Sequence, residues 1–283
     1  MLALVPRAAP AVVLPAPEGR HWSRPAAASA TAGEMGSDPM SAPLELRGLT
    51  APESQARPAD TFMREIADSI VAGRYAADEL LPPEAALAAY FRVSRTIIRE
   101  SMKRLEEKGL VTIQQGRGTQ VRPHAHWNVL DPLVLSAVIA HDEELHTLDE
   151  LTLVRGALEA VMAGQAADRA DEHGVAEVQE AMRLMRDAEH DYARFRDADA
   201  EFHRTVMRLS GNFLAGNIAD TLYSRAREFS RFEGHPPADA TQRTLDEHEA
   251  VLRAIVAHDG ATARTAMNDH IVEAWRRRSL PEH

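Results

Sequence analysis

The stretch from residue 60 to residue 121 limits this chain to few folds, because three short helical patterns in it lead into two short strands. Asp60 can cap a first helix, in which apolar residues recur every four positions until Gly73. A proline pair opens a second short helix over residues 82–91. Ser94 can then cap a third helix, which Gly109 ends.

Two β-prone segments follow the third helix. Residues 110–113 and 119–121 are rich in Val, Ile and Thr, and they flank a Gly116-Arg117-Gly118 turn. A hairpin directly after three helices predicts a winged helix-turn-helix over residues 58–122, a fold that binds DNA.

The third helix carries two stripes of opposite character. The apolar stripe predicts the core face and consists of Ile98, Met102 and Leu105. The basic stripe recurs every four residues and consists of Arg95, Arg99 and Lys103. A helix fits the major groove of B-DNA, where arginine binds guanine edges or phosphates. For any single arginine, a solvated surface position is the simpler interpretation. The two stripes, the helix-turn-helix spacing and the arginine of the Gly-Arg-Gly turn agree with one another, and together they favour a helix that contacts DNA bases.

Other polar groups near this helix suit a DNA backbone. The hydroxyls of Ser94 and Thr96 lie at the helix N-terminus, where phosphate oxygens bind well. Arg117, held between two glycines, can reach the minor groove or the backbone. The net charge of the chain is −11. Residues 92–122 nevertheless hold eight basic and three acidic residues, so the overall charge hides a basic segment.

The rest of the chain divides into a tail, a linker and a long helical region. Residues 1–57 are rich in Ala and Pro and predict a disordered tail, and residues 123–132 form a linker. Residues 133–283 read as amphipathic helices, with a Thr147/Glu150 capping box and breaks near Gly174, Gly211, 234–239 and 259–260. We therefore expect a mainly α fold, in which the winged helix precedes an antiparallel helical bundle.

Composition excludes several classes of protein. The chain has no cysteine, which rules out disulfides, thiol catalysis and Cys-zinc sites. No apolar run approaches the roughly 20 residues needed to span a bilayer. We expect a cytoplasmic protein that has no membrane partner.

One carboxylate and three histidines stand out in the helical region. Asp199 and His203 are four residues apart and share a helix face. His248 shares an inward stripe with Leu252, and His270 lies beside an isoleucine. Alone, the first pair could be a salt bridge, an acid–base pair or half of a metal site. Together the four side chains suit Zn²⁺, Ni²⁺ or Mn²⁺, with positions left open for a ligand.

The segment LLPPEAALAAYFRVSRTIIRESMKRLEEKGLV, followed by QGRGTQV, resembles the DNA-binding domain of GntR-family transcription regulators. The resemblance implies DNA contacts from Ser94, Arg95, Thr96, Arg99 and Gly116. Two positions depart from the family: Ala85 stands where an arginine is usual, and Arg92 where a glycine is usual. The missing arginine predicts an operator different from the common family palindrome.

The spacing Asp-x-x-Phe-His, Glu-His and a last His 22 residues later resembles the all-helical FCD ligand-binding domain of the FadR subfamily. This resemblance implies that Asp199, His203, His248 and His270 bind a divalent metal, most simply Zn²⁺, which helps to hold a carboxylate effector. It implies effector contacts from Arg155 and Asn212. A pair of Arg155 with Glu159 on the helix surface, and a helix-cap role for Asn212, are the structural alternatives.

The linker sequence HWNVLDPLVL and the Ala85 departure resemble a branch of sugar-acid regulators that includes galactonate-responsive ones. We therefore expect a repressor of a carbohydrate-acid operon, which binds a palindromic operator as a homodimer. Two other hypotheses use the same residues: a metal-dependent hydrolase with an attached DNA-binding domain, and a direct metal sensor.

Overall fold

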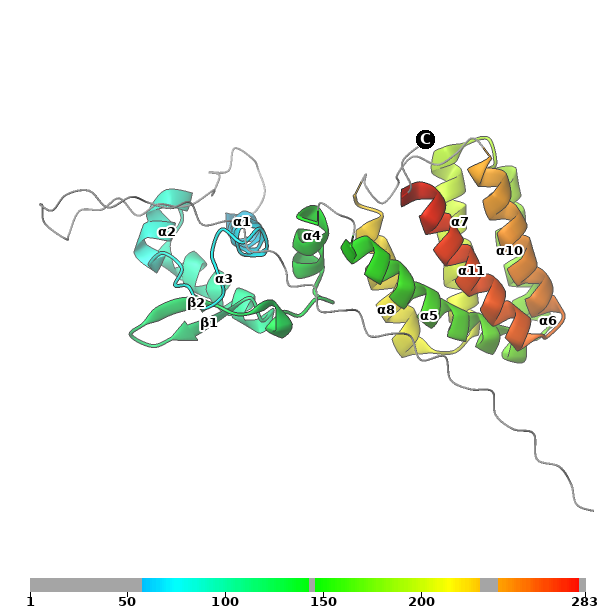
Figure 1. The fold of residues 1–283 in the computed structure, drawn as a ribbon, viewed down its shortest axis with the longest axis horizontal. Helices are drawn as coiled ribbons and strands as arrows, with labels where there is room; N and C mark the ends of the chain where they lie inside the picture. Colours follow the sequence, from blue (N-terminus) through cyan, green and yellow to red (C-terminus); the bar gives the residue numbers. More distant parts are fainter. Residues whose placement is uncertain (1–57, 143–145, 230–238, 280–283) are drawn as a thin grey trace, which may run out of the picture. The chain divides into compact units, whose positions relative to one another are not determined.

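The computed structural model describes residues 58–142, 146–229 and 239–279, so the expected tail over residues 1–57 lies outside the described residues. The element order confirms a mainly helical chain, in which a winged helix-turn-helix precedes a set of long helices (Figure 1). Within the described ranges, no helix combines the length and the apolarity needed to cross a bilayer.

The winged helix is built from three helices and one hairpin. Its elements are α1 (Pro58–Val71), α2 (Glu84–Phe91), α3 (Arg95–Glu107), β1 (Val111–Gln114) and β2 (Gly118–Val121). The strands pair antiparallel, with Val111 opposite Val121 and Gln114 opposite Gly118. Phe62 and Phe91 meet edge to face, with ring centroids 5.0 Å apart, and anchor α1 against α2 in the core.

The side chains of α3 divide as expected. The apolar stripe is buried, and its members are Ile98, Met102 and Leu105. Ser94 caps the helix, because its hydroxyl accepts a hydrogen bond from the backbone N–H of Ile97 at 3.3 Å. The expectation for Asp60 was wrong: α1 begins at Pro58, so Asp60 lies in the first turn, where its charge still suits the helix dipole.

Arg92 ends α2 in a left-handed conformation, with φ of +55°. An L-residue with a β-carbon is strained there, whereas glycine is not. This backbone requirement gives a physical reason for the glycine that is usual at this position.

The segment that follows the wing packs against the C-terminal end of α3. It contains a short 3₁₀ helix (His124–His126) and leads to α4 (Pro132–Ala140), which Asp131 caps. The indole of Trp127 donates to the Arg122 carbonyl at 3.1 Å, and Lys108 pairs with Asp131 at 2.5 Å. A β-carbon on Gly109 would lie 2.1 Å from the His126 carbonyl oxygen, so this contact requires glycine.

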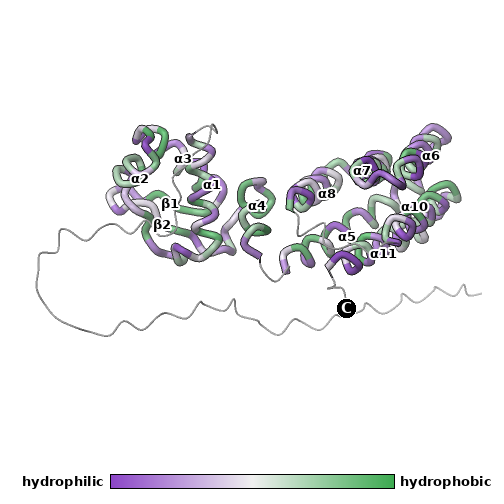
Figure 2. Tube along the Cα trace, turned by 90° about the horizontal axis from the view of Figure 1, so that it is seen from above, coloured by the Kyte–Doolittle hydropathy of each residue, from purple (hydrophilic) through white to green (hydrophobic). Residues whose placement is uncertain are grey.

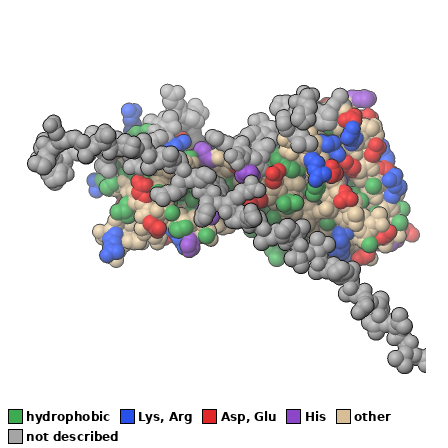
Figure 3. Space-filling model, in the orientation of Figure 1, with side chains coloured by type: hydrophobic (Ala, Val, Ile, Leu, Met, Phe, Trp, Pro, Cys, Tyr) green, Lys and Arg blue, Asp and Glu red, His purple; other side chains and the backbone are tan. Residues whose placement is uncertain are grey.

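The long helices form two layers (Figure 2). One layer contains α6 (Glu172–Asp187), α7 (Tyr192–Leu209) and α8 (Phe213–Ala226), and the other contains α5 (His146–Arg169), α10 (Ala240–Val256) and α11 (Gly260–Ser279). Small residues bring α5 and α11 close together: a β-carbon on Gly164 would lie 3.0 Å from the Gly260 carbonyl oxygen. On the bundle face seen in Figure 3, acidic and basic side chains are interspersed.

One expected helix start was wrong. The helix α5 begins at His146, so Thr147 lies inside it, and the Thr147 N–H donates to the Asp142 carboxylate at 2.6 Å instead of joining a capping box. The break expected near Gly174 is confirmed, but it falls at residues 170–171, between α5 and α6. Gly174 itself lies in the first turn of α6, which Asp171 caps, and packs closely against Leu209. The break at Gly211 is confirmed, because this residue has φ of +69° between α7 and α8.

Candidate metal centre and DNA-reading face

The side chains expected to meet DNA lie on the solvent side of α3 and at the wing tip. The exposed residues are Ser94, Arg95, Thr96, Arg99, Lys103, Gly116 and Arg117. Arg99 pairs with Glu84 of α2 at 3.4 Å, and Lys103 pairs with Glu100 at 2.8 Å. Both pairs are exposed, so they leave these cations available at low cost.

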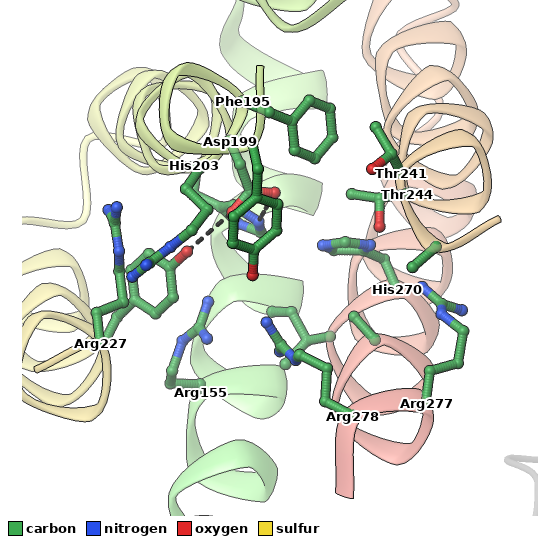
Figure 4. Close-up of a pocket in the computed structure, with 16 residues that line it drawn as sticks. Arg155, Phe195, Asp199, His203, Arg227, Thr241, Thr244, His270, Arg277 and Arg278 are labelled. Carbon is green, nitrogen blue, oxygen red and sulfur yellow. Dashed lines mark hydrogen bonds and ion pairs between the residues drawn. The ribbon is translucent and has the colours of Figure 1, made fainter. Parts of the chain in front are cut away.

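The structure brings together the four side chains that were expected to bind a metal. Figure 4 shows three of them, Asp199, His203 and His270. Asp199 and His203 lie one turn apart on α7, while His248 comes from α10 and His270 from α11. One candidate ligand atom from each residue lies within 4.8 Å of the others. The three histidines are buried and Asp199 is half-buried.

Hydrophobic packing fixes the helices that carry these side chains. Phe202, next to His203, is fully buried and meets the His248 ring edge to face, with centroids 4.6 Å apart. The rings of His248 and His270 have centroids 4.1 Å apart. The imidazoles therefore converge because the apolar faces of α7, α10 and α11 pack together.

Each imidazole is oriented by an acceptor at its Nδ1 atom. His203 Nδ1 lies 2.6 Å from Glu159 Oε2, and His270 Nδ1 lies 2.9 Å from Glu247 Oε2. His248 Nδ1 lies 2.8 Å from the Thr244 carbonyl oxygen, to which it must donate. A proton on Nδ1 leaves Nε2 with a lone pair, which is the form of histidine that binds metals.

The Nε2 atom of His248 gives a direct test of whether a metal fits. This atom is buried and has no hydrogen-bond partner, although Asp199 Oδ1 lies 3.4 Å away. A nitrogen lone pair that faces a carboxylate oxygen is unfavourable unless a cation lies near both. The donor set, its protonation and this orphaned atom all fit a divalent metal.

The pKa shifts of His248, His270 and Asp199 favour the charge states that a metal site needs. Burial and the nearby His270 lower the pKa of His248 well below its usual value, and burial also lowers the pKa of His270. Burial raises the pKa of Asp199, but the surrounding imidazoles and the Tyr223 hydroxyl lower it more, so this carboxyl stays ionised. A neutral His248 and a neutral His270 beside an anionic Asp199 are the states that a metal requires.

A cavity of about 140 Å³ opens beside the four side chains. Its wall includes Asp199, His203, His270 and Tyr223, together with five arginines: Arg155, Arg196, Arg227, Arg277 and Arg278. This volume is below the roughly 300–1,000 Å³ of typical drug-sized sites, so the cavity suits a compact metabolite.

Arg155 lies in the cavity wall and also makes its helix pair. Its Nε donates to Glu159 Oε1 at 2.8 Å, yet both side chains are buried, so the alternative of a surface pair was wrong about the location. The guanidinium lies 4.0 Å above the Tyr223 ring, whose hydroxyl donates to Asp199 Oδ2 at 2.8 Å. Burial alone would raise the pKa of Glu159, but the larger combined effect of Arg155 and His203 lowers this pKa to about 2.

Asn212 does not line this cavity. Its side chain caps α8 by accepting from the Ala215 N–H at 3.2 Å, and it donates to Gln165 at 3.3 Å. Sequence reasoning missed the groups that orient the imidazoles, which are Glu159, Thr244 and Glu247. Glu247 immediately precedes His248, but it orients His270 of the next helix, a relationship that only packing reveals.

Comparisons with known proteins agree with both parts of the chain. Residues 58–121 match the family described as "Bacterial regulatory proteins, gntR family", and residues 150–273 match the FCD domain. The galactonate operon transcriptional repressor of Escherichia coli (strain K12) is 32% identical, over 77% of this chain and 95% of the relative. The HTH-type transcriptional regulator LutR of Bacillus subtilis (strain 168) is 31% identical, over 66% and 85%.

A solved structure described as "Lar controls the expression of the Listeria monocytogenes agr system and mediates virulence" covers 78% of this chain and 95% of its own, with 16% identity and a TM-score of 0.50. That likeness concerns the fold alone. The family matches and the 32% identical relative are sufficient to assign the family. The chain belongs to the GntR family of bacterial regulatory proteins, as a FadR-type member with an FCD domain, and is a DNA-binding transcription regulator rather than an enzyme.

Proposed function

We propose that this regulator is a repressor whose operator affinity is set by a small hydroxy acid, bound beside a divalent metal in the FCD domain. The observation that carries the proposal is the single cavity wall shared by the Asp199/His203/His270 cluster and five arginines. A metal-binding set and an anion-binding set meet there, which is the combination that a carboxylate with neighbouring hydroxyls requires.

Asp199, His203, His248 and His270 would hold the metal, with Zn²⁺ favoured by three imidazoles and one carboxylate. When bound, the metal would supply a positive charge and open coordination positions for acid and hydroxyl oxygens. Glu159, Glu247 and the Thr244 carbonyl keep the three Nδ1 atoms occupied. Tyr223 keeps one oxygen of Asp199 in place through its hydroxyl.

The charge balance of the cavity favours an anionic ligand. Five arginines line it beside the Asp199 carboxylate, and Arg155, Arg227 and Arg277 make ion pairs with Glu159, Asp197 and Glu247. A divalent metal would add two positive charges to this arginine-rich wall, so a carboxylate ligand would be strongly attracted.

We propose a sugar acid as the effector class. The small cavity disfavours a long acyl chain, and the neighbouring arginines and Thr241 and Thr244 offer partners for hydroxyl groups. The galactonate operon transcriptional repressor, which is 32% identical to this chain, is named after the operon of a sugar acid. Arg155 is the proposed carboxylate partner. Asn212, which lies away from the cavity, would act on the effector only through the packing of α8.

At the DNA, Arg95, Arg99 and Lys103 of α3 would enter the major groove, while Ser94 and Thr96 bind phosphate and Gly116 and Arg117 form the wing contact. Two copies on a palindromic operator, in the cytoplasm where that DNA lies, would supply the affinity that a single winged helix lacks. Effector binding changes operator affinity by its different affinity for two arrangements of the dimer.

The effector part is tested by calorimetry of the metal-loaded protein with a panel of hexonates and hexuronates. We expect saturable binding by one acid, lost in Arg155→Gln but retained in Arg183→Gln, an exposed control on α6. A ligand at 100 times its Kd should also stabilise the protein by about 2.7 kcal/mol. Binding of the metal with no response to any acid would support a direct metal sensor instead.

The DNA part is tested by operator affinity. Replacing a base-contacting arginine costs about 1–3 kcal/mol of specific binding. Arg95→Ala should therefore weaken binding of the operator about 5- to 150-fold. Arg64→Ala on α1 serves as the control, because Arg64 lies on an exposed turn outside the proposed DNA-reading face. Unchanged affinity in Arg95→Ala would exclude the proposed face.

A further inference from the structure

Arg92 lies in the turn that joins α2 to α3 (Figure 1), and its backbone there is left-handed, with φ of +55° and ψ of +42°. Two backbone hydrogen bonds close this turn. The Val93 N–H donates to the Ala88 carbonyl at 3.0 Å, and the Arg92 N–H donates to the Ala89 carbonyl at 3.4 Å. This pair of bonds is a Schellman motif, in which the left-handed position is usually a glycine.

The residue type at this position is unusual within the chain. Among the described residues, every other position with a positive φ holds a glycine, Asp78 or His258. Aspartate and histidine are several-fold enriched in the left-handed region, whereas arginine is not. Because backbone strain of this kind is concentrated at functional sites, the Arg92 side chain itself needs a functional explanation.

Contacts within the protein do not supply that explanation. Arg92 is exposed, and no ion pair or side-chain hydrogen bond joins it to another described residue. In contrast, Arg99 of the next helix pairs with Glu84, and Lys103 pairs with Glu100. Within the described part of the chain, therefore, no contact offsets the strain at Arg92, so its partner is expected outside the chain.

The turn places Arg92 beside the end of α3 that is proposed to contact DNA. Ser94, which caps α3, is two residues away. Consecutive Cα atoms are about 3.8 Å apart, so the Arg92 Cα lies at most about 7.6 Å from the Ser94 Cα. In a helix-turn-helix, the helix before the reading helix crosses the DNA backbone, and the N-terminal residues of the reading helix meet base edges. The turn between the two helices therefore lies at the edge of the groove, beside phosphates.

We infer that the Arg92 guanidinium binds a phosphate of the operator backbone at the edge of the major groove, once in each subunit. This inference rests on the DNA-reading face that we propose for α3. A guanidinium suits this partner, because it can form two parallel charge-assisted hydrogen bonds with phosphate oxygens. Such a contact fixes the position of the protein on the duplex without reading its sequence.

The outer side of α2 allows the DNA backbone to approach Arg92. The exposed residues of this helix are Ala85 and Ala89, and their spacing of four and three residues places them on the same face as Arg92. Both side chains are small and uncharged, so neither bulk nor a carboxylate on this face opposes a phosphate. Arg92 supplies the positive charge at the end of the face.

Strain and charge at Arg92 can be separated by substitution. Arg92→Gly removes the charge and relieves the strain, so it should give a more stable domain that binds the operator more weakly. Arg92→Ala removes the charge and keeps the strained β-carbon. The two variants should therefore lose operator affinity equally, although their stabilities differ. Thermal unfolding followed by circular dichroism measures the stabilities and checks that Arg92→Ala folds.

The test is fluorescence anisotropy of the full chain on a duplex that the wild-type protein selects from random DNA, at several salt concentrations. At about 0.15 M salt, we expect Arg92→Ala to weaken binding on the order of 10-fold. The slope of log K against log salt concentration should become less steep by about two, one phosphate for each subunit of a dimer. Binding to an unrelated duplex should weaken by a similar factor. Arg92→Lys keeps the charge and should retain most of the slope, while Arg64→Ala on α1 is the control and should match the wild type.

An unchanged salt slope in Arg92→Ala would overturn the inference, and so would Arg92→Gly with wild-type affinity. A loss of sequence preference without a change in slope would also overturn it, because that result indicates a base contact. Arg95→Ala in the same assay separates this inference from the proposed DNA-reading face. If Arg95→Ala weakens binding and Arg92→Ala does not, the phosphate contact alone is wrong, and if neither weakens binding, the DNA-reading face is wrong as well.

Discussion

His248 Nε2 lies 3.4 Å from Asp199 Oδ1, and this buried nitrogen has no hydrogen-bond partner. Thr244 fixes the proton on the opposite ring nitrogen, so the two facing atoms are both electron donors. Such an arrangement is unfavourable by itself and becomes favourable when a cation binds between them. This pair of facing donor atoms therefore supports a cation site beside His248 and Asp199.

Removing His248 should abolish tight metal binding. We expect His248→Ala to lose tight Zn²⁺ binding, measured by calorimetry, and with it the thermal stabilisation that Zn²⁺ gives. His173→Ala, which removes an exposed histidine of α6, is the matched control and should bind Zn²⁺ normally. Equal Zn²⁺ affinity in both variants would place the metal elsewhere.

The groups behind the imidazoles should matter almost as much as the ligands. Glu159→Gln removes the charge that orients His203 and pairs with Arg155. Loss of such a partner typically lowers metal affinity about 10- to 100-fold. We expect this loss in competition titrations with a chelator, whereas Glu180→Gln on the exposed side of α6 should have no effect. A Glu159→Gln variant with unchanged affinity would argue against the orienting role.

The metal-free protein should lose stability as pH falls below about 6.5. Burial holds the pKa of His248 well below the unfolded value of 6.5, so the unfolded chain takes up a proton that the folded chain does not. The free energy of unfolding should therefore fall by up to about 1.4 kcal/mol per pH unit and per such histidine. Urea unfolding with a chelator present, at pH 7.5 and 5.5, measures this, and a rise in stability towards pH 5.5 would contradict it.

Arg92 should be a site of backbone strain. The left-handed conformation costs an L-residue roughly 1–2 kcal/mol, part of which glycine loses again through its freedom in the unfolded chain. We expect Arg92→Gly to stabilise α2 and α3 by about 0.5–1 kcal/mol in amide hydrogen exchange. Arg92→Ala loses the same charge but keeps the β-carbon, so it should not stabilise. Equal effects of the two variants would mean that charge, not strain, matters here.

Much of the fold was predictable from local signals. Ser94, the glycines of the wing and the apolar stripe of α3 act over a few residues, so their pattern alone places the helix-turn-helix. Helix starts were less predictable. The sequence suggested that a capping box at Thr147 begins α5, but the Asp142 carboxylate accepts the hydrogen bond from the Thr147 N–H instead. Likewise, Gly174 is explained by contact with Leu209 rather than by a helix end.

The convergence of the four candidate ligands was predictable from the sequence, whereas their surroundings were not. Regular spacing and family resemblance identify Asp199, His203, His248 and His270. The partners of these residues come from other helices, as with Glu159 of α5 and Tyr223 of α8, and no sequence interval relates them. Arg227, Arg277 and Arg278 join the cavity for the same reason, because the helix packing brings distant segments to one point.

We propose that a hydroxy acid and a metal at this site together control operator binding. The test is fluorescence anisotropy of labelled operator, with Zn²⁺-loaded protein titrated by the acid that binds most tightly in calorimetry. We expect the acid to weaken operator binding by wild-type protein about 5- to 150-fold, the usual range of allosteric coupling, and to have no effect on Asp199→Asn. Operator affinity that stays unchanged while the acid saturates the wild-type protein would contradict the account.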